Sequence, residues 1–121
     1  MRTIHYMKYI SRNYIRTNPH ITFLFGDNLE RRGLGGQAKE MRGEPNAIGI
    51  ATKKAPRNFT IDFFTDDEYD SNCQAILSDI AKIPEHGIII IPENGIGTGL
   101  AKLKESAPRT FAFLQEQLKN L

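Results

Sequence analysis

Two glycine-rich stretches contain the residues of this sequence that are best suited to bind a ligand. The first consists of Gly26-Asp27-Asn28 and, after a short polar segment, Gly33-Leu34-Gly35-Gly36-Gln37. The second reads Glu93-Asn94-Gly95-Ile96-Gly97-Thr98-Gly99-Leu100. Glycine lets a backbone turn tightly and approach a ligand closely, so that N–H groups can converge on an anion. Phosphate is therefore the first ligand that we expect.

Neither stretch is a specific motif when taken alone. The second lacks the Gly-Lys-Ser/Thr ending of a Walker A loop and the full spacing of a dinucleotide-binding loop. A tight connection between a strand and a helix would need the same glycines for its geometry. This structural interpretation stays open, and the presence of two such stretches in one chain is what favours a ligand site.

Each stretch follows a segment that is typical of a buried strand. Residues 21–25 are branched or aromatic, and residues 88–91 are four isoleucines followed by Pro92. A short helix is expected after each stretch, and the dipole of the helix that begins after Ala101 would favour an anion. If the two strands are parallel, both loops emerge at the carboxyl edge of the sheet, where open α/β sheets bind ligands. We expect the loops to face one molecule.

The remaining elements follow from periodicity and from helix-start signals. Strands are expected at 2–10, 47–52 and 59–64, and a helix at 11–18 with Ser11 as its cap. Thr65 to Glu68 has the form of a capping box, which opens a helix that buries Tyr69, Cys73, Ile76, Leu77 and Ile80. A last helix begins near Pro108 and buries Ala107, Phe111, Leu114, Leu118 and Leu121. This order predicts one α/β domain over residues 1–121, with three layers (α/β/α) and a mixed, largely parallel central sheet.

Composition narrows the classes of protein to which the chain can belong. Its 121 residues, 40% of them hydrophobic and 25% charged, fit one ordinary globular domain. No long apolar segment is present, so we expect a cytoplasmic protein with no membrane partner. Cys73 is expected in the core, and His5, His20 and His86 lack metal-ligand spacing, so we expect no metal site and no cofactor. The oligomeric state does not follow from the sequence.

Basic residues exceed acidic ones between Gly26 and Arg57. Seven Lys or Arg stand against four acids there, although the net charge of the whole chain is only +2. Such an excess suits an anionic ligand, and it is equally typical of a solvated surface. Few aromatic side chains are interleaved with these cations, so RNA binding is the least favoured of the functions that this basic stretch could serve.

The two glycine-rich stretches resemble the ligand-binding loops of macro domains. In the first, an acid and an asparagine precede a Gly-Gly turn into a helix, and the second is similar to the macro-domain phosphate loop. The chain is shorter than a typical macro domain and resembles compact macro-like proteins of bacteria and their phages. The resemblance implies ADP-ribose or a related nucleotide as the ligand.

The resemblance also implies positions for individual residues. Asp27 would lie near the adenine or the backbone of the first loop, and Asn28 near the distal ribose. The distal ribose and pyrophosphate would contact Gly35, Gly36 and Gln37. The phosphates would be wrapped by Gly95, Ile96, Gly97, Thr98, Gly99 and Leu100. Gly26, Gly33 and Asn94 are also expected to bind the ligand. Alternatively, Asp27 and Asn28 form a simple Asx turn whose side chains bond the local backbone.

Hydrolysis of an ADP-ribose linkage would require a general base or a nucleophile. The catalytic candidates are Asp27, Glu93 and Lys39, because each lies in or beside a glycine-rich loop. No motif around them specifies a mechanism. The sequence therefore supports two leading interpretations, a macro-like hydrolase that processes ADP-ribose and a module of the same fold that recognises or sequesters a nucleotide without turnover.

Overall fold

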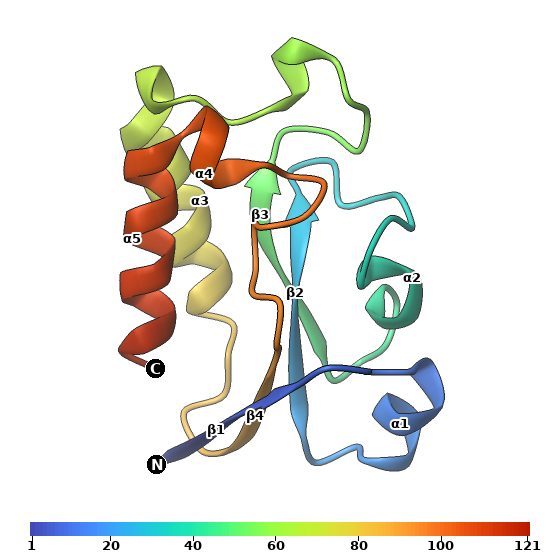
Figure 1. The fold of residues 1–121 in the computed structure, drawn as a ribbon. Helices are drawn as coiled ribbons and strands as arrows, with labels where there is room; N and C mark the ends of the chain where they lie inside the picture. Colours follow the sequence, from blue (N-terminus) through green and yellow to red (C-terminus); the bar gives the residue numbers. More distant parts are fainter.

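A four-stranded parallel sheet forms the centre of the protein. The computed structural model describes residues 1–121, and its strands lie in the order β1-β4-β2-β3 (Figure 1). Their bounds are β1 (Arg2–Met7), β2 (Thr22–Asn28), β3 (Ala47–Lys53) and β4 (Gly87–Pro92). All three strand pairings are parallel, so the expected α/β class is confirmed, whereas the expectation of a mixed sheet is wrong.

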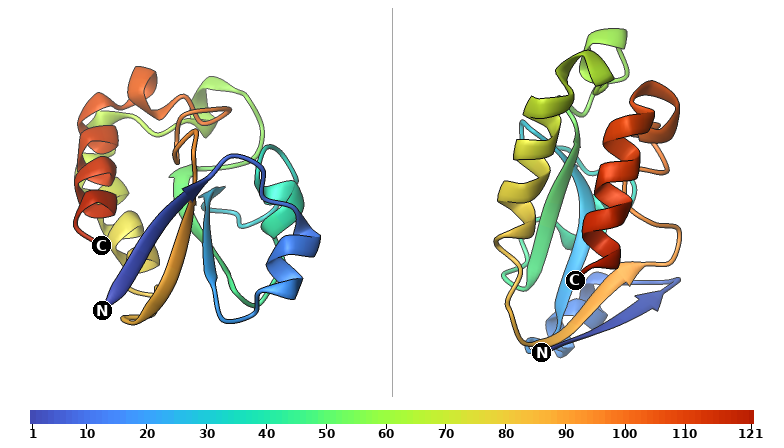
Figure 2. Two further views of the ribbon diagram at one scale, coloured as in Figure 1. Left: turned by 60° about the horizontal axis from the view of Figure 1, so that its bottom comes forward. Right: turned by 90° about the vertical axis from the view of Figure 1, so that its left-hand side faces the viewer.

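Helices cover both faces of this sheet, as Figures 1 and 2 show. One face carries α1 (Arg12–Thr17) and α2 (Ala38–Met41), and the opposite face carries α3 (Tyr69–Ile80) and α5 (Pro108–Lys119). The single turn α4 (Leu103–Ser106) precedes α5. Two short 3₁₀ helices, η1 (Thr60–Asp62) and η2 (Asp66–Glu68), lie between β3 and α3. None of the helices has the length and apolar content needed to cross a membrane.

Alternation along the strands divides the core into two apolar clusters. On β4, Ile89 and Ile91 belong to the larger cluster, which includes residues of α3 and α5. Ile90 belongs to the smaller cluster, together with Met41 of α2 and residues near α1. Successive strand residues point to opposite faces, so a run of isoleucines can serve both clusters. The expectation that β4 lies in the interior of the sheet is confirmed, although Ile88 is 39% exposed.

The segment from Phe59 to Leu77 differs most from expectation. Residues 60–62 form η1 rather than a strand, and only Phe63 makes an isolated antiparallel bridge, to Lys53. Asp62 accepts from the backbone N–H of Phe59 and so closes a turn where alternation alone predicts extended chain. On α3, Cys73 and Ile76 are buried as expected, but Leu77 is 45% exposed.

The expected capping box of α3 is wrong. Thr65 makes no capping hydrogen bond with its side chain. Asp66 instead accepts from the backbone N–H groups of Arg109 and Thr110, at the first turn of α5. The acidic residue therefore caps a helix that lies more than forty residues further along the chain, a pairing that local sequence rules cannot predict.

Candidate functional site

The two glycine-rich loops meet in a cleft at the carboxyl edge of the sheet. In Figure 1 this edge is at the top, where the loop after β4 passes over the arrowheads of β2 and β3. The cleft has a volume of about 270 Å³ and is lined by residues of both loops and by the end of β3. Leu100 of the second loop lies against Gly35 of the first, because a Cβ at position 35 would come within 2.8 Å of the leucine Cδ1. The expectation that both loops emerge at one edge is confirmed.

The second loop presents a continuous run of free backbone donors. The N–H groups of the six residues from Ile96 to Ala101 donate no hydrogen bond within the protein. Gly95 and Gly97 have φ angles of 89° and 83°, which only glycine adopts readily. Gly99 is not at positive φ, and a Cβ there would meet nothing within 4 Å. The loop therefore has the open N–H groups that an anion requires.

The short helix after this loop contributes less than expected. Helix α4 is one turn long and begins after Lys102, which has a left-handed φ of 46°. So short a helix has little dipole, because the macrodipole is a sum over aligned peptide units. Any affinity for an anion must come from the loop N–H groups and from side chains, not from a helix N-terminus.

The first loop repeats this arrangement on the other wall of the cleft. The N–H groups from Arg32 to Gln37 likewise donate no hydrogen bond within the protein. Gly33 and Gly36 have φ angles of 98° and 56°. The side chain of Gln37 donates from Nε2 to the carbonyl of Ile10 at 2.8 Å and so holds the loop to the segment after β1. Two runs of unbonded donors thus line a single cleft.

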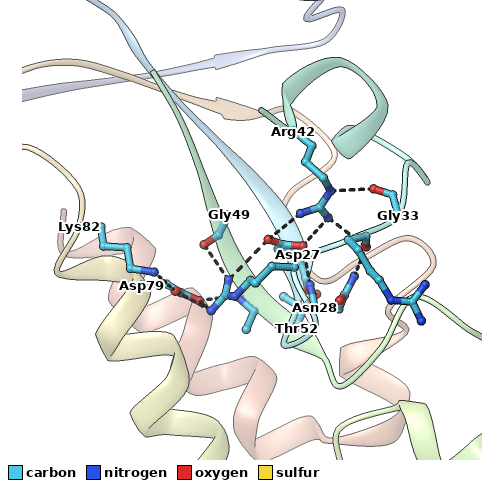
Figure 3. A network of polar contacts seen from close by, with 11 residues as sticks. Asp27, Asn28, Gly33, Arg42, Gly49, Thr52, Asp79 and Lys82 are labelled. Carbon is cyan, nitrogen blue, oxygen red and sulfur yellow. Dashed lines mark hydrogen bonds and ion pairs between the residues drawn. The ribbon is translucent and has the colours of Figure 1, made fainter. Parts of the chain in front are cut away.

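Asp27 lies at the base of the cleft within a network of charged groups (Figure 3). It is 7% exposed and accepts from the backbone N–H of Asn28 at 2.8 Å. Its Oδ1 lies 2.5 Å from Nη2 of Arg42, and its Oδ2 lies 3.5 Å from Nη1 of Arg31. This bond is to the next residue and not to the residue two positions on, so it is not the Asx turn that was one alternative from the sequence. The two ion pairs were not anticipated.

Gly49 makes room for this carboxylate. A Cβ at position 49 would lie 2.5 Å from Oδ2 of Asp27. Arg31 donates to the carbonyl of Gly49 and also binds both carboxylate oxygens of Asp79, which is fully buried on α3. Arg31 adopts a left-handed φ of 55°, which is uncommon for a residue with a Cβ. The first loop is thereby fixed to the sheet and to α3.

Asn28 has an unused acceptor at the cleft. Its side chain donates from Nδ2 to the carbonyl of Arg32, while its Oδ1 has no hydrogen-bond partner. The residue is 6% exposed and lines the cleft. A buried amide oxygen without a partner costs free energy unless a donor reaches it. A ligand hydroxyl or amine is one such donor.

The structure separates the three catalytic candidates. Only Asp27 lines the cleft, whereas Glu93 and Lys39 are exposed and lie outside it. Ile96, expected to bind the ligand, points its side chain into the core and is 1% exposed. Ile96 stands between two glycines of the loop, but its side chain packs in the core. Its position in the loop therefore did not indicate a contact with the ligand. The remaining expected ligand-binding residues line the cleft.

Three cations of the cleft were not assigned to it from the sequence. Arg32, Arg42 and Lys53 line its walls, beside Thr52 and Pro56. Lys53 ends β3, the third parallel strand whose carboxyl end meets this edge, and that position was the signal that could have identified it. Burial lowers the pKa of Lys53, and the nearby Asp62 carboxylate acts in the opposite direction. Its Nζ also lies 4.7 Å from the ring centroid of Phe63.

Two other cations of the basic stretch are paired within the protein. Lys54 pairs with Glu68, and Arg57 with Asp62 and Glu30. No group of three or more His, Cys, Asp or Glu side chains is placed to hold a metal ion. Of the cations that line the cleft, Arg32 pairs with Glu30 and Arg42 with Asp27, whereas Lys53 has no ion pair.

Comparison with known proteins gives a family but no activity. A family model described as "Family of unknown function (DUF7831)" matches residues 5–117. No curated protein and no solved structure matches the chain. The matched range includes both glycine-rich loops and all four strands, apart from the first residues of β1.

Proposed function

The chain belongs to this family of unknown function, DUF7831, and we propose that it binds ADP-ribose or a related nucleotide through phosphate groups held between its two glycine-rich loops. The observation that carries the proposal is the pair of unbonded N–H runs, Arg32 to Gln37 and Ile96 to Ala101, on opposite walls of one cleft. Converging backbone donors form an anion-binding concavity. A diphosphate presents enough oxygen atoms to use both runs.

The charge of the cleft supports an anionic ligand. Three cations, Arg32, Arg42 and Lys53, line the cleft against one acid, Asp27, and Arg32 also pairs with Glu30 outside the cleft. An anion brought into a partly enclosed cationic cleft is attracted more strongly than in open solvent. This balance favours phosphate over a neutral sugar or a cationic ligand.

The unused acceptor of Asn28 supports a ligand that also carries hydroxyl groups. The macro-domain resemblance places this residue near a ribose, and its Oδ1 lacks a donor. The cleft volume, about 270 Å³, lies just below the range of about 300–1,000 Å³ for ligand pockets. We infer that the cleft holds the phosphates and one ribose, and that the rest of the nucleotide extends through the open mouth.

The same geometry favours binding without turnover. The carboxylate of Asp27 is occupied by two guanidinium groups and a backbone N–H, and Glu93 and Lys39 lie away from the cleft. A general base needs a free position within hydrogen-bond reach of the proton that it removes. Recognition or sequestration of a nucleotide therefore ranks above hydrolysis of an ADP-ribose linkage.

Isothermal titration calorimetry with ADP-ribose tests the proposal, with NAD and ADP as comparison ligands. We expect micromolar binding by the wild-type protein and at least about tenfold weaker binding by Gly99→Val. Valine at this position adds bulk to the phosphate loop in a place where the fold leaves open space. Ala112→Val, a similar change on an exposed part of α5, is the matched control and should bind normally.

The outcomes separate the interpretations. Equal affinity of Gly99→Val and wild type would remove the second loop from the site. Absence of binding by the wild-type protein to all three nucleotides would reject nucleotide binding. Release of ADP-ribose from an ADP-ribosylated peptide at a rate above the protein-free control would favour the hydrolase over the recognition module.

A further inference from the structure

The two edge strands of the sheet, β1 and β3, differ in how far their outward backbone groups are covered. Along β3, the carbonyl of Gly49 accepts from Arg31, and the N–H of Ala51 donates to Oδ2 of Asp79 at 2.8 Å. Phe63 bridges Lys53 at the end of the same edge. Side chains and a short bridge thus occupy the positions that a neighbouring strand would take. Covering an edge in this way prevents unwanted strand pairing.

The outer edge of β1 has no such cover. This strand pairs only with β4, and no other segment runs along its outer side in either view of Figure 2. The carbonyl groups of Met1 and Met7 accept from Gly87 and Glu93, which fixes the alternation of the ladder. The backbone groups of the odd-numbered residues therefore face β4, and those of Arg2, Ile4 and Tyr6 face outward.

A groove lies beside this open edge, between β1 and α5. Tyr6, Leu118 and Lys119 are among the residues that line it, and Tyr6 is 59% exposed. Gln115 lines the same groove, and its Nε2 is buried without a hydrogen-bond partner. An unpartnered amide donor beside unpaired strand groups fits an extended chain that brings both carbonyl groups and side chains.

The charged residues near this edge indicate the sign of the charge that a bound extended segment would carry. The first 26 residues contain four Lys or Arg and no acid. Arg12 and Arg16 pair with Glu44, whereas Arg2, Lys8 and Lys119 have no ion-pair partner. A second copy of β1 would bring like charges together. We propose that the outer edge of β1 binds an extended, acidic segment of another protein, which adds to the sheet as a fifth strand.

A titration followed by ¹⁵N NMR tests this proposal. The probe is a short synthetic peptide in which Glu alternates with Val, and the control peptide has Lys in place of Glu. We expect the amide signals of Ile4 and Tyr6 to shift with the acidic peptide, and their hydrogen exchange to slow, because their N–H groups gain partners. The Lys peptide should leave these signals unchanged.

Two variants separate backbone pairing from other contacts. Tyr6→Pro removes an outward N–H but no hydrogen bond to β4, and it should weaken binding roughly fivefold or more beyond the loss caused by Tyr6→Ala. Far-UV circular dichroism checks that Tyr6→Pro keeps the fold. Lys119→Glu, an exposed change, should weaken binding of the Glu peptide and strengthen that of the Lys peptide.

Other outcomes would overturn the proposal. Absence of shifts at Ile4 and Tyr6 with the Glu peptide would do so, as would shifts confined to the glycine-rich loops. A dimer of the protein alone in analytical ultracentrifugation, lost in Tyr6→Pro, would assign the edge to a second copy. Binding of a single-stranded oligonucleotide in place of the peptide would assign it to nucleic acid. None of these results depends on ADP-ribose binding at the cleft.

Discussion

Asp27 illustrates how a single carboxylate can organise a ligand site while remaining unavailable for proton transfer. Its oxygens are bonded to Arg42, Arg31 and the N–H of Asn28, so it neutralises two cations and fixes the start of the first loop. The guanidinium of Arg42 in turn donates to the carbonyl of Gly33 at 2.8 Å. The shape of the cleft wall thus depends on a residue whose type alone would suggest catalysis.

Asp27→Asn tests this structural role. The amide keeps the size of the side chain but leaves Arg42 without a counter-charge, whereas Arg31 keeps its ion pair with Asp79. We expect the free energy of unfolding to fall by about 1–3 kcal/mol, measured by urea denaturation. Unchanged stability, combined with loss of a measured turnover, would instead identify Asp27 as a catalytic residue.

Two glycines of the site provide a matched comparison. Gly49→Ala places a Cβ 2.5 Å from Oδ2 of Asp27, whereas Gly99→Ala places one in open space. We expect Gly49→Ala to lower the free energy of unfolding by about 1–3 kcal/mol, and Gly99→Ala to leave it nearly unchanged. Equal unfolding midpoints for the two variants would show that the carboxylate of Asp27 moves away from Gly49 without cost.

The sequence indicates which residues are suited to a site more readily than it indicates which groups those residues contact. A glycine at position 49 is compatible with a close approach, but the sequence does not show that the approaching group is the carboxylate of Asp27. Asp27 pairs with Arg31, four residues on within an irregular loop, and with Arg42, fifteen residues on beyond that loop. Such ion pairs leave no periodic pattern in the sequence. Only the structure shows that the carboxylate of Asp27 is already bonded to two guanidinium groups.

At the scale of elements, the carboxyl of Asp66 joins η2 to the first turn of α5. It accepts from the N–H groups of Arg109 and Thr110 and from the hydroxyl of Thr110. Burial alone would raise the pKa of Asp66, but these hydrogen bonds outweigh it and lower the pKa below its ordinary value. The ionised carboxylate therefore stabilises the packing of α5.

This cap predicts a dependence of stability on pH. A carboxyl whose pKa is lowered by folding adds stability above its unfolded pKa of about 3.9, and the contribution is lost as the pH falls through the folded value. Asp66→Asn should be less stable than wild type by about 1 kcal/mol near neutral pH, and the difference should shrink below about pH 4. The measurement is urea unfolding over a pH series.

Asp67→Asn is the control for this series, because Asp67 is exposed and forms no hydrogen bond or ion pair. Its stability should follow that of wild type. A difference between wild type and Asp66→Asn that stays constant at every pH would contradict the assigned role of the ionised cap.

Most elements could be predicted because their signals are local. Ser11 caps α1 by accepting from the N–H of Tyr14, and Pro108 begins α5, both as local rules indicate. The failures arise where a side chain bonds to a distant element or closes a turn, as for Asp66 and for Asp62 in η1. Strand direction was also only partly predictable, because it depends on crossovers rather than on strand composition.

At the scale of the whole molecule, the parallel sheet brings the two glycine-rich loops together. The carboxyl ends of β2 and β4 lie at one edge, so the loop that follows each strand opens on the same cleft. This convergence could be predicted from two strand-loop patterns and the general rule for parallel sheets. The contribution of Lys53 was not predicted, because β3 ends in a basic segment without glycine, and only its position at the carboxyl end of a parallel strand could have indicated it.

The most direct test of a nucleotide site shared by both loops is a ¹⁵N NMR titration of the wild-type protein with ADP-ribose. We predict that amide signals from Arg32 to Gln37 and from Ile96 to Ala101 shift together, with one dissociation constant, because both runs of free N–H groups bind the same ligand. Shifts in only one loop, or with two different constants, would contradict a shared site. Absence of shifts in both loops at saturating ADP-ribose would leave them as connections of the fold alone.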